Sequence, residues 1–291
     1  MKRIILVLLI LVLLVGSMSC KQQKDVNLKI GVMPSENILP IIYAEENGIF
    51  EKYGLNVEVT IFKSAVDRDT AFQAGELDGV ATDMISVIFL NDAGFDVKIT
   101  AEDITNFKII SVVDDGKTIG VSKNTVIEYV ADKYIEKNNK DYEIIYVPAV
   151  PVRLELLNTK ELDMAVLPEP LASVPMDAKV MDYSNDMDLF PGVHAFNQDA
   201  LDTKDVEAFY KAYNEAVEII NSSSVDEFKS ILTDSIGFSE EMFEGYTLPI
   251  YNTAKASNEA DFDSVMAWMN IKEYSASSYK LEDVSDFSFI K

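Results

Sequence analysis

The sequence predicts an α/β fold of two similar lobes, each built on a mixed, mostly parallel sheet flanked by helices. Short apolar strands alternate with helical segments from Leu28 onward, a pattern typical of parallel sheets covered on both faces. The alternation stops at the charged turn of residues 114–117 and then restarts. A helix–turn–strand unit also occurs twice, as FQAGELDGVATD at residues 72–83 and as LELLNTKELDMAVLPEP at residues 154–170. The restart and the repeat together indicate two related lobes.

The elements of the first lobe follow from local start and stop signals. Pro40 is compatible with a helix only in its first turn, and Gly48 supplies the stop of that helix. Residues 34–37 form the turn before it. We expect strands at residues 28–33, 55–62, 77–81, 97–101 and 107–113, and helices at residues 38–47, 66–74 and 84–92.

The second lobe repeats this order and is followed by helices. We expect strands at residues 118–122, 142–147, 162–167 and 193–197, and helices at residues 125–137 and 152–157. From Thr203 the chain becomes helical, with an apolar stripe at three- and four-residue spacing made of Val206, Phe209, Tyr213, Val217 and Ile220. A capping box starts at Ser224, and Asn258 opens the last amphipathic helix. These helices add no strands, so we expect them to pack on the first lobe.

The first 27 residues have the features of an export leader and a tether. Lys2 and Arg3 precede an apolar run at residues 4–15 that is shorter than a membrane span, and small residues follow it. The lone cysteine, Cys20, comes directly after them, as in the lipobox of bacterial lipoproteins, although Ser17 stands where that pattern usually has leucine. We expect a lipoprotein signal peptide at residues 1–19, lipidation of Cys20 and a polar tether at residues 20–27. A free cysteine beside an ordinary cleavage site is the alternative.

Composition excludes several classes of function. The chain has a formal net charge of −24, so we expect no binding of nucleic acid or anionic lipid headgroups. It contains none of the motifs GxGxxG, P-loop, HExxH or CxxC, so we expect no catalytic residues, metal or cofactor. His194, the only histidine, lies in an expected strand without an identifiable partner, which favours a core or hinge residue over an acid–base role.

The strand ends supply candidate ligand-binding residues, because ligands of open α/β sheets bind beyond the carboxyl ends of the strands. In the repeated units these positions are Thr82, Asp83, Met84, Pro168 and Glu169. Expected helix N-termini, which can hold polar ligand atoms, add Ser64, Ala65, Ser122, Asn124 and Thr125. Helix capping is the alternative for the acidic and hydroxyl members, including Asp103. Asp78 and Asp163 precede equivalent strands, where turn capping is favoured over chemistry.

Four segments resemble the substrate-binding proteins of bacterial ABC importers, in the group for nitrate, sulfonates, taurine and thiamine-type pyrimidines. They are LPIIYAEENGIFEKYGLNVEV at residues 39–59, AFQAGELDGVATD at 71–83, GKTIGVSKNTVIEYV at 116–130 and ELDMAVLPEPLASV at 161–174. The resemblance implies a two-lobed periplasmic-binding-protein fold of type II with two crossing strands as a hinge. It places lobe 1 at residues 28–112 plus 198–291 and lobe 2 at residues 113–197. It also implies ligand contacts from Pro34, Ser35, Glu36 and Asn37.

The same resemblance implies a monomeric, membrane-anchored extracytoplasmic receptor that delivers a small molecule to ABC permease and ATPase subunits. Asp83 stands where anion-binding relatives usually have a small uncharged residue. Because closure would bring Asp83 and Glu169 together, we expect a neutral or cationic, donor-rich ligand, with a pyrimidine or thiamine precursor favoured. The alternatives are an anion-binding protein of the same group and a ligand sensor without transport. An enzyme like the fungal pyrimidine synthases is disfavoured, because their chemistry uses a histidine and a cysteine-rich motif that this chain lacks.

Overall fold

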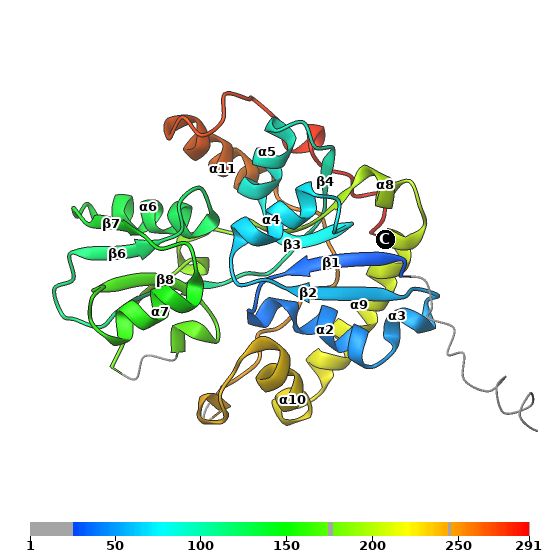
Figure 1. Cartoon of the computed structure of the whole chain (residues 1–291), viewed down its shortest axis with the longest axis horizontal. Helices are drawn as coiled ribbons and strands as arrows, with labels where there is room; N and C mark the ends of the chain where they lie inside the picture. The colour runs from blue at the N-terminus through cyan, green and yellow to red at the C-terminus, as the bar shows by residue number, and fades with distance from the viewer. Residues whose placement is uncertain (1–25, 174–176, 244–245, 291) are drawn as a thin grey trace, which may run out of the picture.

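The computed structural model describes residues 26–173, 177–243 and 246–290, and within them the chain forms two α/β lobes (Figure 1). The expected signal peptide and Cys20 lie outside the described residues. No helix in the described ranges is long and apolar enough to cross a membrane.

The first lobe contains a five-stranded sheet in the order β2-β1-β3-β10-β4. Its strands are β1 (Leu28–Val32), β2 (Val57–Ile61), β3 (Gly79–Asp83), β4 (Val97–Glu102) and β10 (Gly192–Asn197). Strands β1, β2 and β3 run parallel, whereas β10 pairs antiparallel with both β3 and β4. The ends of β1 and β3 therefore lie at the same edge of the sheet.

The second lobe has a sheet of the same design, in the order β7-β6-β8-β5-β9. Its strands are β5 (Phe107–Ser111), β6 (Thr118–Val121), β7 (Glu143–Tyr146), β8 (Met164–Pro168) and β9 (Lys179–Tyr183). Strand β6 is parallel to β7 and β8, and β5 is antiparallel to β8 and β9. The expectation of two related, mostly parallel sheets is confirmed.

The lobe boundaries differ from those expected at residues 112 and 197. Strand β5 follows β4 in the chain but joins the second sheet, and β10 follows β9 but joins the first sheet. The antiparallel strand of each sheet is therefore the first strand after a crossing between the lobes. The chain crosses between the sheets through residues 103–106 and 184–191, not within the two strands themselves.

Each crossing segment is hydrogen-bonded to the strand that follows the other crossing segment. The Asp103 N–H donates to Gly192 O at 2.9 Å, and Ser184 and Phe107 exchange two hydrogen bonds. A glycine is required for this approach, because a Cβ on Gly192 would lie 2.5 Å from Asp103 O. The hinge is therefore a short double connection.

Helices cover both faces of each sheet. Helices α2 (Leu39–Glu46), α3 (Ile49–Lys52), α9 (Asp205–Ser222) and α10 (Lys229–Ile231) contribute to the apolar core on one face of the first sheet. The predicted stripe of α9 is buried in this core. Helices α4 (Ala65–Gln73), α5 (Met84–Asp92) and α11 (Glu259–Ile271) lie on the other face. In the second lobe, α6 (Val126–Asn138) and α7 (Val150–Asn158) lie on opposite faces of the sheet.

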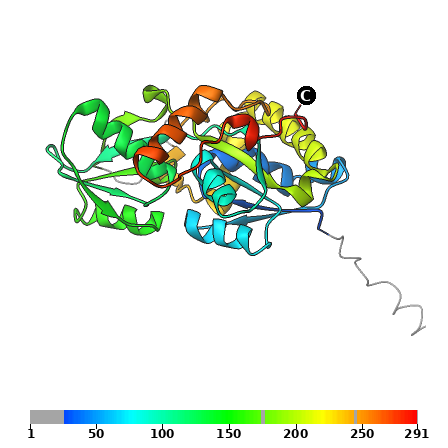
Figure 2. The same ribbon diagram turned by 90° about the horizontal axis from the view of Figure 1, so that it is seen from above.

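The last long helix, α11, touches both lobes. It packs on α5 of the first lobe, as expected, but Tyr129 of α6 also bonds Ser264 of α11 at 2.8 Å. Figure 2 shows α11 lying along the junction between the lobes. One apolar cluster accordingly runs from α5 through α11 to α6.

Candidate functional site

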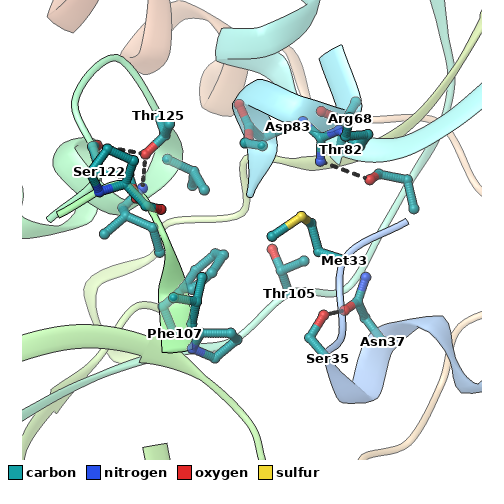
Figure 3. Close-up of a pocket in the computed structure, with 17 residues that line it drawn as sticks. Met33, Ser35, Asn37, Arg68, Thr82, Asp83, Thr105, Phe107, Ser122 and Thr125 are labelled. Atoms are coloured by element: carbon teal, nitrogen blue, oxygen red, sulfur yellow. Dashed lines mark hydrogen bonds between the residues drawn. The ribbon is translucent and has the colours of Figure 1, made fainter. Parts of the chain in front are cut away.

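A cavity of about 80 Å³ lies between the lobes, at the carboxyl ends of the parallel strands (Figure 3). Strands β1 and β3 end at one wall, and β6 and β8 end at the opposite wall. Its wall consists of Met33, Ser35, Asn37, Ala65, Arg68, Ala81, Thr82, Asp83, Thr105, Phe107, Ser122, Thr125, Val126, Ile127, Pro148, Val150 and Pro168. The cavity could hold a small organic molecule.

Four helices begin at this cavity because each one follows a parallel strand. Ser64, Asp83 and Thr125 cap α4, α5 and α6, and their side chains accept hydrogen bonds from backbone N–H groups of the first helical turn. Helix α7 begins at Val150, which lies in the wall. The helix dipoles add partial positive charge near the cavity. Capping, the alternative noted for Ser64, Asp83 and Thr125, is therefore present.

In the second lobe, the hydroxyls of two wall residues donate their hydrogen bonds to backbone carbonyls of the protein. Ser122 donates to Pro148 O at 3.0 Å and accepts from Arg153 Nη1 at 2.6 Å. Thr125 donates to Ser122 O at 2.7 Å and accepts from the Ile127 N–H. A hydroxyl has one proton and two lone pairs, so each oxygen can only accept from a ligand.

The first lobe presents a similar surface. The Ser35 hydroxyl donates to the Asn37 Oδ1 atom, so its lone pairs remain for the cavity. The hydroxyls of Thr82 and Thr105 are buried and find no hydrogen-bond partner among the described residues. Because buried polar groups are normally paired, these two hydroxyls are candidates for direct ligand contact.

Arg68 and Asp83 are the charged residues of the wall. Arg68 donates to Ala81 O at 3.1 Å, to Ser86 Oγ at 3.2 Å and to Asp69 Oδ1 at 2.8 Å. Burial raises the pKa of Asp83 to about 6, against the opposing attraction of Arg68. The guanidinium thus lies near two carboxyl groups of its own lobe, which offset its charge.

Glu169 does not meet Asp83 in the cavity. Its carboxylate pairs with Lys108 and accepts from Ser173 Oγ at 2.7 Å. It lines a smaller adjacent pocket together with Glu36. Burial raises the pKa of Glu36, which also feels the charge of Glu169. The expected convergence of two carboxylates on one ligand is therefore wrong, because β5 places Lys108 beside Glu169.

The predicted site residues divide into three groups. Those that line the cavity are Ser35, Asn37, Ala65, Thr82, Asp83, Ser122, Thr125 and Pro168. Glu36 and Glu169 line the adjacent pocket, and the Glu36 N–H donates to Glu169 O at 3.1 Å across the lobes. Pro34, Ser64, Met84 and Asn124 adjoin wall residues in the chain without belonging to the described wall.

Sequence reasoning missed Arg68, Thr105 and Phe107. The repeat carried a signal for Arg68: the spacing that relates Leu77-Asp78 to Leu162-Asp163 also relates Arg68 to Arg153. Both arginines lie in the first turn of the helix before the repeated strand, and both are buried. Asp78 and Asp163 accept backbone N–H groups of Lys29 and of Lys117 and Thr118, which confirms a structural role.

His194 lies in the core and not in the cavity wall. Its ring lies among Phe209, Tyr210 and Tyr213, and both nitrogens lack a hydrogen-bond partner within the described chain. Burial lowers the pKa of His194 to about 4, so the ring is neutral near pH 7. Its Nε2 atom is 3.8 Å from Asp103 Oδ1.

Two α/β lobes that enclose a cavity at the strand ends define the periplasmic-binding-protein fold. Residues 21–149 match the model of the NMT1-like family. No curated protein matches the sequence.

Solved structures confirm the fold at low sequence identity. The ligand-binding component of an ABC-type import system from Staphylococcus aureus, with zinc bound, has a TM-score of 0.77 at 13% identity, over 90% of this chain and 97% of that one. The aliphatic sulphonate binding protein SsuA from Escherichia coli has a TM-score of 0.71 at 12% identity, over 89% of this chain and 96% of that one. The nitrate-binding protein NrtA from Synechocystis PCC 6803 has a TM-score of 0.69 at 15% identity, over 91% of this chain and 87% of that one.

These three structures are named as ligand-, sulphonate- and nitrate-binding proteins, and the last two belong to the group that the sequence resembles. The described residues of this chain contain no group of three or more His, Cys, Asp or Glu side chains placed to hold a metal ion.

Proposed function

We propose that the protein is the extracytoplasmic solute-binding component of an ABC importer and holds a small molecule between its lobes. The observation that supports this most is the interlobe cavity with polar groups from both lobes in its wall. A ligand in this cavity contacts both lobes only when they approach each other, so its binding favours the closed arrangement.

The proposed ligand is neutral or cationic and bears hydrogen-bond donors. In the observed bonding the hydroxyls of Ser35, Ser122 and Thr125 offer lone pairs to a ligand, and Asp83 adds a carboxylate. Arg68 and the helix N-termini would favour an anion, but Asp69 and Asp83 offset the charge of Arg68. A free anion would therefore leave acceptor atoms facing acceptor atoms, which is costly in a buried site.

A flat heterocycle with an amino group fits the rest of the wall. Phe107, Met33 and Pro168 give it an apolar surface, and Thr82 and Thr105 add unpaired hydroxyls. Ring nitrogens can accept from these hydroxyls, and amino groups can donate to the acceptor atoms. An aminopyrimidine of the thiamine-precursor kind is the favoured class.

The proposed location is the outer face of a membrane, with lipid on Cys20 and a permease as partner. The described chain enters β1 at Leu28, which leaves a short polar segment after Cys20 as a tether. A Cys20→Ala protein should leave the membrane fraction while keeping its ligand affinity. Loss of affinity would contradict the separation of anchor and receptor.

Calorimetric titration with cytosine, methanesulfonate and nitrate tests the ligand class. We expect binding of cytosine, and weakening by about 1–3 kcal/mol in Asp83→Asn, the cost of losing a charge-assisted hydrogen bond. Asp96→Asn, an exposed carboxylate in the same lobe, is the matched control and should not change binding. Preferred binding of either anion by the parent protein would overturn the proposed ligand class.

A further inference from the structure

A buried chain of three side chains leads from the cavity to the hinge. Ser35 Oγ donates to Asn37 Oδ1, and Asn37 Nδ2 lies 2.5 Å from Asp103 Oδ2. Ser35 and Asn37 line the cavity, whereas Asp103 lies behind them in the crossing segment of residues 103–106. All three are buried. Figure 3 shows Ser35 and Asn37 side by side at the cavity.

The protonation state of Asp103 fixes the direction of these bonds. An ionised carboxylate only accepts, so Asn37 must donate its Nδ2–H and must offer Oδ1 to the Ser35 hydroxyl. The Ser35 proton then points away from the cavity, and the ligand meets lone pairs.

Protonated Asp103 allows the reverse direction without loss of a bond. Its O–H can donate to Asn37 Oδ1 once the Asn37 amide turns over, which places Nδ2–H against Ser35 Oγ. The Ser35 oxygen then accepts from Asn37, and its own proton becomes available to the cavity. The proton on Asp103 comes from solvent and returns to it.

We propose that Asp103 is a specificity-determining positioning residue, which sets through Asn37 whether Ser35 accepts from or donates to the bound molecule. Its effect on affinity rests on the proposed function, but the bond reversal itself does not. Donor-bearing ligands are favoured when Asp103 is ionised, and acceptor-bearing ligands are favoured when it is protonated.

The surroundings of Asp103 allow this change near neutral pH. The titratable groups that face it are Glu102 of β4, neutral His194 of β10, Tyr210 and Tyr213 of α9, and Tyr251. Glu102 is itself paired with Lys255 at 3.0 Å. Burial raises the pKa of Asp103 to about 7, against the hydrogen bonds from Asn37 and from the Ile104 N–H, while Glu102 raises it further.

Nuclear magnetic resonance of the ligand-free protein tests the reversal directly. The side-chain amide of Asn37, assigned by its loss in Asn37→Ser, should change its ¹H and ¹⁵N shifts between pH 5 and pH 9. The ¹³C shift of the Asp103 carboxyl should change with the same midpoint. Different midpoints, or an Asn37 amide that does not respond, would overturn the proposal.

Two variants identify the titrating group. Asp103→Asn should abolish the Asn37 transition, whereas His194→Gln should keep it. A transition that survives Asp103→Asn, or disappears in His194→Gln, would assign the effect elsewhere and overturn the proposal.

Binding of cytosine supplies the functional readout. Between pH 5.5 and pH 8.5 the affinity of the parent protein should rise by about tenfold more than that of Asp103→Asn, the value of one hydrogen bond, because ionisation of Asp83 contributes to both proteins alike. A pH response equal in both proteins would overturn the specificity role. Absence of cytosine binding at every pH would instead count against the proposed function and leave the resonance test to decide on Asp103.

Discussion

Thr82 and Thr105 hold the cavity hydroxyls that lack partners in the described protein, and they provide a test of ligand contact at single residues. Thr82→Val should leave the free energy of unfolding unchanged or slightly higher, because an unpaired buried hydroxyl is removed. The same substitution should weaken cytosine binding by about 1–2 kcal/mol. Denaturant unfolding and calorimetry measure the two effects.

Thr100→Val is the matched control for Thr82→Val. Thr100 is buried in the same lobe, but its hydroxyl bonds His194 O at 3.2 Å and Tyr210 OH at 2.5 Å. Its loss should destabilise the fold by about 1–2 kcal/mol and leave ligand affinity unchanged. The reverse pattern in the two variants would remove Thr82 from the site.

The equivalent arginines of the two lobes should respond differently to the same substitution. Arg68→Met leaves Asp69 and Asp83 without their cation and should cost about 3 kcal/mol of unfolding free energy at pH 7. Arg153 has no carboxylate partner in the described chain, and its Nε and Nη2 atoms are unpaired. Burial lowers its pKa to about 10. Arg153→Met loses the bonds from Nη1 to Ser122 Oγ and Val147 O but leaves no carboxylate unpaired, so it should cost less than Arg68→Met. Equal losses in urea unfolding would contradict this account.

Among the elements, α11 links the loop of residues 122–125, which carries Ser122 and Thr125 of the cavity wall, to the first lobe. Buried Glu128 of α6 accepts from the Asn124 N–H at 2.7 Å and from Tyr274 OH at 2.8 Å. Lys272, which follows α11, lies 3.0 Å from the Glu128 carboxylate and 2.9 Å from Asp132. Asn124 has a positive φ of 61°, so Glu128 fixes a loop conformation that is otherwise unfavourable for a non-glycine residue.

Lys272→Met should lower the unfolding free energy by about 1–3 kcal/mol at pH 7, because the buried carboxylate of Glu128 loses its half-buried cation. Burial opposes ionisation of Glu128, but its hydrogen bonds outweigh burial and lower its pKa below the usual 4.5. A lowered carboxyl pKa contributes stability above the usual pKa, which is lost as the pH falls. The difference between parent and variant should therefore shrink below pH 4.5. Lys133→Met, which removes one surface pair of α6, is the control and should change little.

Element type could be predicted from the sequence where the signal was local. The stripe of α9, the caps at Ser64, Asp83 and Thr125, and the repeated helix–turn–strand unit are all encoded within a few residues. The sheet partners of β5 and β10 could not be predicted in this way, because strand pairing joins residues far apart in the chain. The same long-range pairing places Lys108 beside Glu169, which the expectation about ligand charge did not include. Arg68 was missed because only its equivalence to Arg153 marked it.

At the scale of the whole molecule, the two edges of the lobe junction are joined unequally. An apolar cluster and the Glu128 contacts join α6 to α11 on one edge. On the other edge, the backbone bond from Glu36 to Glu169 joins the lobes. We therefore expect the lobes to separate at the Glu36 edge when the site opens, while α6 and α11 stay together at the opposite edge.

Spin-label distances test this motion. Labels at the exposed Val66 of α4 and Val152 of α7, one in each lobe beside the cavity, should move closer when cytosine binds. Labels on Glu136 of α6 and Asn270 of α11 should keep their separation. Equal changes in both pairs, or none under saturation, would contradict hinge closure about the α6–α11 edge.

The central claim is that a neutral or cationic donor-bearing solute binds between the lobes. The most direct test measures the melting temperature of the protein with each member of a library of solutes sorted by charge. Donor-bearing neutral or cationic heterocycles should raise the melting temperature of the parent protein. This rise should disappear in Ala65→Phe, which fills the cavity, and remain in Ala93→Phe, an exposed control on the same lobe. Stabilisation by anions above all others, or stabilisation that survives in Ala65→Phe, would contradict the claim.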